Sequence, residues 1–408
     1  ASGETASAAP FGGRWPFYSE ACQRDVQELL ASSVGLSAYR SNPDFPVGPR
    51  EGSWAWKVEQ QAASLHGVKH AIAVNSGTMA LLAALVAARR TERIKPEGEI
   101  IVPPYTFSAT AAAVIHAGYE PVFADVDRTG RLDASEAAKL VGKRTAAILP
   151  VDLFGKLATY DAVAAPKGLG LLDLGVPVIQ DACQAVGTRR AGQHLFGMAC
   201  AWSFNGAKNV PAGEAGAMGT NDEAMAHFAR LLVSHGENWN DCWVGLNGRL
   251  NELTACVVWH GLQSVVLRNS QRRELSARLS PQLRDLSEIR SVPDSSCGDH
   301  ALYVWPLVLS MGLDRAAFCK RLRELGLEVG EGYIRPTLDQ YQAFQGYRRG
   351  PLPVVHDLSD NRLCIFSQVR PPATLEDMDY LAEAIRWALG RGKRPGAKQI
   401  GQGKVTDF

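Results

Sequence analysis

Reactive side chains occur where expected strands of this sequence end. The apolar run 70–74 leads into Ser76, Gly77 and Thr78, and an Ala/Leu-rich helical pattern follows. At such a helix N-terminus, free backbone N–H groups, the helix dipole and two hydroxyls bind anions. The same hydroxyls would equally serve as helix caps without a ligand. This segment therefore indicates either an anion site or a simple cap.

Two further residues follow apolar runs in the same way. Asp181 comes directly after the run 176–180, and Lys208 lies among small residues after the run 200–204. Ligands of open α/β sheets bind at the carboxyl ends of strands, where a carboxylate can hold a pyridine nitrogen protonated. A confined lysine amine suits Schiff-base chemistry, because only the neutral amine attacks a carbonyl. A helix-capping aspartate and an ordinary loop lysine remain the alternatives for these two residues.

Short apolar runs alternate with helical patterns over most of the chain. This alternation predicts an α/β sheet with both faces covered. The runs that we expect to be strands are 70–74, 99–103, 146–151, 176–180 and 200–204.

From about Ser264 a long amphipathic helix is predicted, and the strand and helix patterns after it indicate a smaller second domain. The ends of the chain lack apolar periodicity. The expected units are a flexible tail over 1–11, a large domain over 12–263, a small C-terminal domain over 264–390 and a flexible tail over 391–408.

The composition excludes several kinds of partner. The 43 Lys and Arg residues balance the 42 Asp and Glu residues, so no overall field favours nucleic acid or an anionic membrane. Cysteines without CxxC pairs and histidines without HxH or HExxH spacing predict no metal site and reduced thiols. Without an apolar stretch of about 18 residues or a signal-peptide pattern, we expect a soluble cytoplasmic protein.

Seven motifs, in order along the chain, resemble those of the DegT/DnrJ/EryC1/StrS aminotransferases. The resemblance covers roughly residues 12–390. It implies pyridoxal 5′-phosphate (PLP) as cofactor and the type I PLP-dependent aminotransferase fold, an α/β fold with a large, mostly parallel sheet domain and a smaller C-terminal α/β domain. The motifs are NSGT (75–78), PPYTF (103–107), PVFADVD (121–127), PVDLFG (150–155), IQDACQAVG (179–187), SFNGAKNVPAGEAG (203–216) and GLNGRLNEL (245–253).

The resemblance also implies roles for single residues. Lys208 would form the Schiff base and move the proton during catalysis, and Asp181 would pair with the pyridine nitrogen. Gln184 would bond the phenolic oxygen of the cofactor, and Phe107 would stack on its ring.

By the same resemblance, residues of two subunits would bind the phosphate of PLP. Ser76, Gly77, Thr78 and Ser203 would hold it within one chain, and Asn247 would reach the phosphate of the neighbouring subunit. The resemblance therefore implies a homodimer with shared active sites.

Substrate contacts are expected where the sequence departs from the family. Tyr333 and Arg335 lie in GEGYIRPTLDQYQAF (330–344), which replaces the usual H-Y-x-P-x-H or T-Y-x-P. Near the end of the chain, CIFSQVRPPAT (364–374) replaces the more frequent S-L-P-x-H-P. His235 falls in a loop that reaches toward an active site in the family. Tyr333, Arg335 and His235 are therefore the candidate substrate contacts.

The resemblance implies that an amino group moves from L-glutamate or L-glutamine to a keto group of a nucleotide-linked keto-sugar. A cyclitol ketone is the alternative acceptor, because the opening FGGRWP is similar to that of cyclitol and aminobenzoate members of the family. PLP-dependent sugar dehydration is disfavoured, since those relatives carry His in place of Lys208. A catalytically silent homologue is disfavoured because Lys208, Asp181 and Gln184 are all present.

Overall fold

The computed structural model describes residues 15–32, 35–39, 47–164, 168–238, 241–294 and 300–396. The expected tail over 1–11 lies outside these ranges, as do residues 397–408 of the expected C-terminal tail. In the ranges described, no helix combines the length and the apolar character that a membrane span requires.

Strands β1–β7 form one mixed sheet in the order β3-β2-β4-β5-β6-β7-β1. Its two halves are joined by parallel bridges from Ile148 to Val178 and from Val151 to Asp181. Strand β7 runs antiparallel to its two neighbours, and the other pairs are parallel. The predicted mostly parallel sheet is confirmed. The strands are β1 (His70–Val74), β2 (Glu99–Val102), β3 (Glu120–Phe123), β4 (Thr145–Ile148), β5 (Ile179–Asp181), β6 (Ala199–Ser203) and β7 (Gly216–Thr220).

Helices cover both faces of this sheet. Alternate residues of a strand point to opposite faces, and in β1 Ile72 and Val74 join one buried cluster while Ala71 and Ala73 join another. The first cluster contains α3, α4 and α6, and the second contains α2 and the start of α7. These helices, with the short α5, are α2 (Trp54–His66), α3 (Gly77–Arg90), α4 (Ala109–His116), α5 (Ala134–Leu140), α6 (Glu223–Val233) and α7 (Glu252–Leu279).

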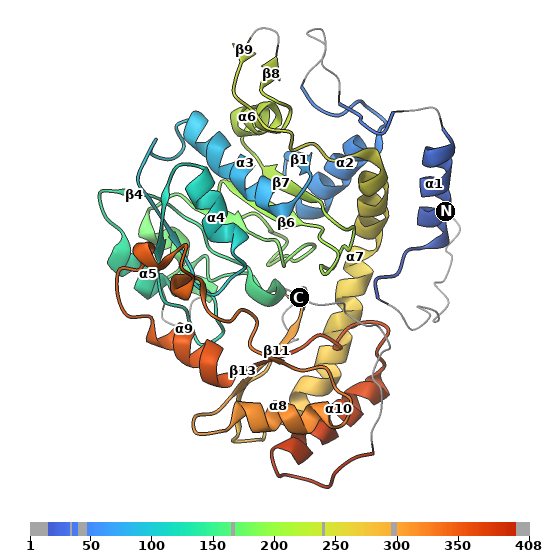
Figure 1. The fold of residues 1–408 in the computed structure, drawn as a ribbon, viewed down its shortest axis with the longest axis vertical. Coiled ribbons are helices and arrows are strands. Elements are labelled where there is room, and N and C mark those ends of the chain that lie inside the picture. Colours follow the sequence, from blue (N-terminus) through green and yellow to red (C-terminus); the bar gives the residue numbers. More distant parts are fainter. Residues whose placement is uncertain are drawn as a thin grey trace.

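Helix α7 runs without interruption from the large domain into the small one (Figure 1). The side chain of Asn251 caps its start by accepting from the N–H of Thr254. The predicted boundary at residue 264 therefore lies within this helix. The small-domain elements are the antiparallel strands β10 (Ile289–Ser291), β11 (Trp305–Leu309), β12 (Gly330–Glu331) and β13 (Leu363–Phe366), and helices α8 (Arg315–Arg323), α9 (Pro353–Asp357) and α10 (Leu375–Ala388).

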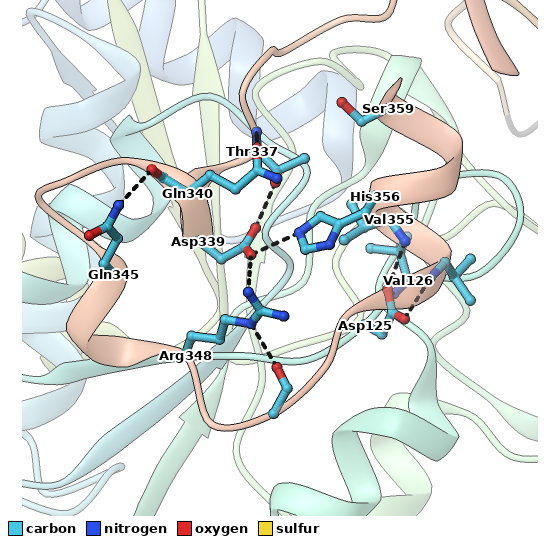
Figure 2. A network of polar contacts seen from close by, with 12 residues as sticks. Asp125, Val126, Thr337, Asp339, Gln340, Gln345, Arg348, Val355, His356 and Ser359 are labelled. Carbon is cyan, nitrogen blue, oxygen red and sulfur yellow. Dashed lines mark hydrogen bonds and ion pairs between the residues drawn. The ribbon is translucent and has the colours of Figure 1, made fainter. Parts of the chain in front are cut away.

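The segment between β12 and β13 is tied to the large domain by carboxylates (Figure 2). Asp125, which follows β3, accepts from the backbone N–H groups of Val354 and Val355, both at 2.9 Å, and so caps α9. Within the segment, the buried Asp339 carboxylate contacts His356 Nε2 at 2.9 Å. These bonds fix the segment that carries Tyr333 against the sheet domain.

Helix α1 (Glu20–Ala31) packs on α7 through polar residues. His260 Nε2 lies 2.7 Å from Asp25 Oδ2, and the thiol of Cys256 stands one turn before His260. The potential ligand atoms of Asp25, Cys256 and His260 all lie within 4.8 Å of one another. This grouping could not be predicted from the sequence, because Asp25 is far along the chain from Cys256 and His260.

Candidate active site

Asp181 lies at the carboxyl end of β5 and is 3 % exposed. Its Oδ2 accepts from the hydroxyl of Thr110 at 2.8 Å, and its Oδ1 accepts from the backbone N–H of Cys183 at 3.1 Å. A carboxylate has about four lone-pair sites. Asp181 is therefore a buried carboxylate that is held in place and can still accept a further donor.

The start of α3 lies against the ends of β5 and β6. Ser76 caps α3, since its hydroxyl accepts from the N–H of Met79 at 3.1 Å. A Cβ atom on Gly77 would approach Ser203 Cβ to 2.8 Å and Cys183 Sγ to 3.1 Å, so only glycine permits this close packing. The structure thus brings Ser76, Gly77 and Ser203 together beside Asp181, and the exposed Thr78 follows them on α3.

Lys208 lies on the loop after β6, where it is half-buried. Its Nζ atom stands 4.2 Å from the ring centroid of Tyr303. Burial and the neighbouring Asp181 raise the pKa of the Cys183 thiol, whereas the charge of Lys208 acts on that pKa in the opposite direction. Lys208 and Asp181 therefore act electrostatically on the same small region.

Gln184 joins this region to the small-domain segment. Its Oε1 accepts from the N–H of Phe154 at 2.7 Å, and its Nε2 donates to the hydroxyl of Tyr333 at 3.0 Å. The backbone N–H of Tyr333 donates to the hydroxyl of Tyr105 at 2.8 Å. Burial, followed by the nearby Tyr303, raises the pKa of Tyr333, so its hydroxyl stays protonated at neutral pH.

Two other residues predicted for the site are more exposed to solvent. The ring of Phe107, on the loop between β2 and α4, is 58 % exposed. Arg335 is about half exposed, and its Nε lies 3.9 Å from Asp360 Oδ1. The structure therefore places the half-buried Tyr333 within the site, through its bond to Gln184, and Arg335 beside an acidic side chain at the surface.

Asn247 and His235 form an exposed group beyond the start of α3. Arg249 joins them, because its NH2 group contacts His235 Nε2 at 2.9 Å and its Nε donates to Asn247 Oδ1 at 3.4 Å. The side chain of Asn75 donates to the backbone carbonyl of Asn247 at 3.1 Å. These residues thus lie next to the Ser76 loop, but their side chains point to the surface.

Several contributors were not predicted from the sequence. Thr110 lies on α4, four residues after Thr106 of the PPYTF motif, and the two hydroxyls are 3.0 Å apart. Its place just after that motif was a usable signal. Tyr303 lies in an apolar run before β11 and offered no signal, since only the fold brings it to Lys208.

The sequence profile of the DegT/DnrJ/EryC1/StrS aminotransferase family matches residues 49–386. The chain belongs to this family. Members of the family are PLP-dependent aminotransferases, so the chain is an aminotransferase-family enzyme and the predicted resemblance is confirmed.

Individual relatives extend this finding. The chain is 34 % identical over 288 residues to GDP-perosamine synthase of Caulobacter vibrioides, covering 68 % of this chain and 75 % of that protein. It is 31 % identical over 370 residues to the erythromycin biosynthesis sensory transduction protein EryC1 of Saccharopolyspora erythraea, covering 89 % and 94 %. The crystal structure of 3-amino-5-hydroxybenzoic acid synthase matches with a TM-score of 0.76 and 26 % identity, covering 93 % of this chain and 98 % of that one. The predicted aminotransferase fold is confirmed.

Proposed function

We propose that this protein transfers an amino group from L-glutamate or L-glutamine to a keto group of a nucleotide-linked keto-sugar, with PLP on Lys208. The observation that carries the proposal is the convergence of Lys208, Asp181 and the N-terminus of α3 at one edge of the sheet. The similarity to GDP-perosamine synthase supports a sugar acceptor.

The residues present fit PLP. The N-terminus of α3 with Ser203 suits its phosphate, and the spare accepting capacity of the buried Asp181 suits its pyridine N–H. Lys208 supplies the amine that would bind its aldehyde. When bound, PLP supplies an electron-poor ring that accepts negative charge from the substrate carbon.

The side chains around this site have separate tasks in the proposed reaction. Asp181 would hold the ring nitrogen protonated, and Thr110 and the Cys183 N–H fix the orientation of its carboxylate. Lys208 moves the proton to and from the reacting carbon. The Tyr303 ring lies 4.2 Å from Lys208 Nζ, close enough to shield one side of the amine from water.

The proposed assembly is a homodimer in which Asn247 reaches the phosphate of the neighbouring subunit. The segment before Asn247 supports this assembly because it exposes large apolar side chains: Trp243 is 39 % exposed, Val244 95 % and Leu246 42 %. Contiguous exposed apolar residues mark interaction surfaces. The adjoining strands β8 (Glu237–Asn238) and β9 (Asp241–Cys242) project from the large domain in Figure 1.

A cyclitol ketone is the second candidate acceptor. The Trp15-Pro16 opening and the match to the synthase of an aminobenzoic acid favour a ring that carries no nucleotide. The segment 330–344 would discriminate between the two acceptors, since it departs from the pattern of the family.

The test is a pair of half-reactions with the purified, PLP-loaded protein. L-glutamate or L-glutamine should abolish the Schiff-base absorbance, and the correct acceptor should then restore it. Nucleotide-linked keto-sugars and inososes are compared at equal concentration in the second step. Persistence of the absorbance with both donors would contradict the proposed donors, and restoration by the inosose alone would favour the cyclitol reaction.

A further inference from the structure

Three buried arginines surround the ring of Trp15. Arg268 and Arg272 project from α7, and Arg370 follows β13. Their guanidinium carbons lie 5.4, 5.1 and 5.4 Å from the centroid of the Trp15 ring, and the three residues are 7 %, 1 % and 7 % exposed. We refer to Trp15, Arg268, Arg272 and Arg370 as the Trp15 arginine cluster.

Within the described parts of the chain, no carboxylate forms an ion pair with these arginines. Arg272 donates through NH1 to the carbonyls of Leu302 and Tyr303, at 2.9 and 3.1 Å, and Arg268 donates to the carbonyl of Phe17 at 3.1 Å. Both Nε and NH2 of Arg272 are buried and have no hydrogen-bond partner among the described residues.

The neighbouring side chains do not supply the missing charge either. Glu328 acts on Arg370 electrostatically, but it is exposed and accepts from the hydroxyl of Ser367. Gln368, two residues before Arg370, has both amide atoms buried without a partner in the described structure, as has Nε1 of Trp15. The cluster therefore offers several unused donors and three positive charges.

Such an arrangement is unfavourable by itself. A buried ion without a counter-charge is strongly unfavourable, and the face of one aromatic ring compensates only a small part of that cost. Burial lowers the pKa of Arg370 to about 10, and burial together with the charges of Arg370 and Arg268 lowers that of Arg272. An anion bound beside these guanidinium groups would stabilise their charged form.

The cluster adjoins the candidate active site. Arg272 holds the backbone carbonyl of Tyr303, and the ring of the same Tyr303 lies 4.2 Å from Lys208 Nζ. Tyr303 therefore joins the cluster to Lys208, so a molecule that reacts at Lys208 is a candidate to bring the anion.

We propose that the Trp15 arginine cluster binds a carboxylate group of the amino donor. This inference rests on the proposed transamination. Arginine forks match carboxylates through paired N–H···O bonds. The proposed donors carry a carboxylate beside the reacting amine, and L-glutamate carries a second one.

Glutarate tests the proposal, because it has the carboxylates of glutamate but no amine and cannot react. Its binding to the PLP-loaded protein is measured by calorimetry and by the shift in melting temperature. Arg370→Met removes one charge of the cluster while keeping a long side chain. Arg278→Gln, on the exposed face of the same helix as Arg272, is the matched control.

Wild type and Arg278→Gln should bind glutarate alike, and Arg370→Met should bind it about 10- to 100-fold more weakly. Without glutarate, Arg370→Met should melt no lower than wild type, since an uncompensated buried charge has been removed. Unchanged glutarate binding by Arg370→Met would overturn the proposal. So would equal binding of chloride or inorganic phosphate, which would identify a counter-ion site only.

A kinetic comparison separates the two substrates. In Arg370→Met, the half-reaction with L-glutamate should require a correspondingly higher donor concentration, and the half-reaction with the acceptor should be unaffected. A defect confined to the acceptor would assign the cluster to the acceptor and overturn the proposal. If the protein catalyses no transamination at all, glutarate binding still shows whether the cluster binds a carboxylate. Failure of the proposed function can therefore be distinguished from failure of the proposed carboxylate site.

Discussion

Two buried polar networks of the large domain differ in whether all of their hydrogen-bonding capacity is used. In the first, every ring nitrogen of His66 and His194 has a partner: for example, Trp202 Nε1 donates to His194 Nε2 at 2.8 Å, and His194 Nδ1 lies 2.6 Å from the carbonyl of Thr188. The rings of His66 and Trp202 stack at 4.1 Å. This network is closed, and a closed network has nothing left with which to bind a ligand.

The second network, around Asp181, is open. The Asp181 carboxylate accepts from Thr110 and from the Cys183 N–H and keeps accepting capacity. It also lies at the carboxyl end of its strand, whereas the histidines lie behind the sheet with α2. Unused hydrogen-bonding capacity, rather than burial of polar groups, therefore distinguishes the candidate site. Substitutions in the open network should lower the catalytic rate, and substitutions in the closed network should lower the free energy of unfolding.

The largest expected effect is on catalysis. Asp181→Asn should retain PLP but lose transamination by about 100-fold or more, because a neutral amide cannot keep the ring nitrogen protonated. Steady-state rates and melting temperature are measured on the same preparation. Near-normal turnover would reduce Asp181 to a structural residue.

The converse effect is expected in the closed network. His194→Leu leaves Trp202 Nε1 and the carbonyl of Thr188 without partners, so the free energy of unfolding should fall by about 1–3 kcal/mol. The rate per folded molecule should stay within twofold of wild type. His227→Leu, at an exposed position of α6, is the control. A loss of catalytic rate in His194→Leu without a loss of stability would contradict the distinction between the two networks.

The closed network also predicts a pH dependence. Burial lowers the pKa of His194 to about 4, below its ordinary 6.5. The folded state therefore binds this proton less readily than the unfolded state, and the contribution of His194 to stability is lost as pH falls from about 6.5 towards 4. Denaturant unfolding of wild type and His194→Leu is compared across this range. Their difference in unfolding free energy should shrink on acidification, and a constant difference would contradict the assigned cause.

The smallest expected effect concerns assembly. Asn247→Ala should weaken PLP retention about tenfold without loss of fold, because a phosphate contact from the neighbouring subunit is removed. Sedimentation and cofactor absorbance are followed over a dilution series. A wild-type monomer that holds PLP as tightly as the undiluted protein would rule out a shared site.

Much of the large-domain sheet could be predicted from the sequence. The strand runs at 70–74 and 200–204 became β1 and β6, because short continuous apolar segments bounded by turn-forming residues are typical of buried strands. Asp181 and Lys208 were recognisable because motif spacing fixes their places at strand ends. The Tyr303 contact with Lys208 and the arginines around Trp15 could not be predicted. They come from segments that are far apart in the sequence and meet only through packing of the two domains.

The assignment of Lys208 is the central claim, and reduction tests it most directly. The purified PLP-loaded protein should be yellow, and borohydride should fix the cofactor to a single peptide. Mass mapping is predicted to find the adduct on Lys208, and Lys208→Ala should yield none. An adduct on another lysine, or no adduct in the wild type, would contradict the account.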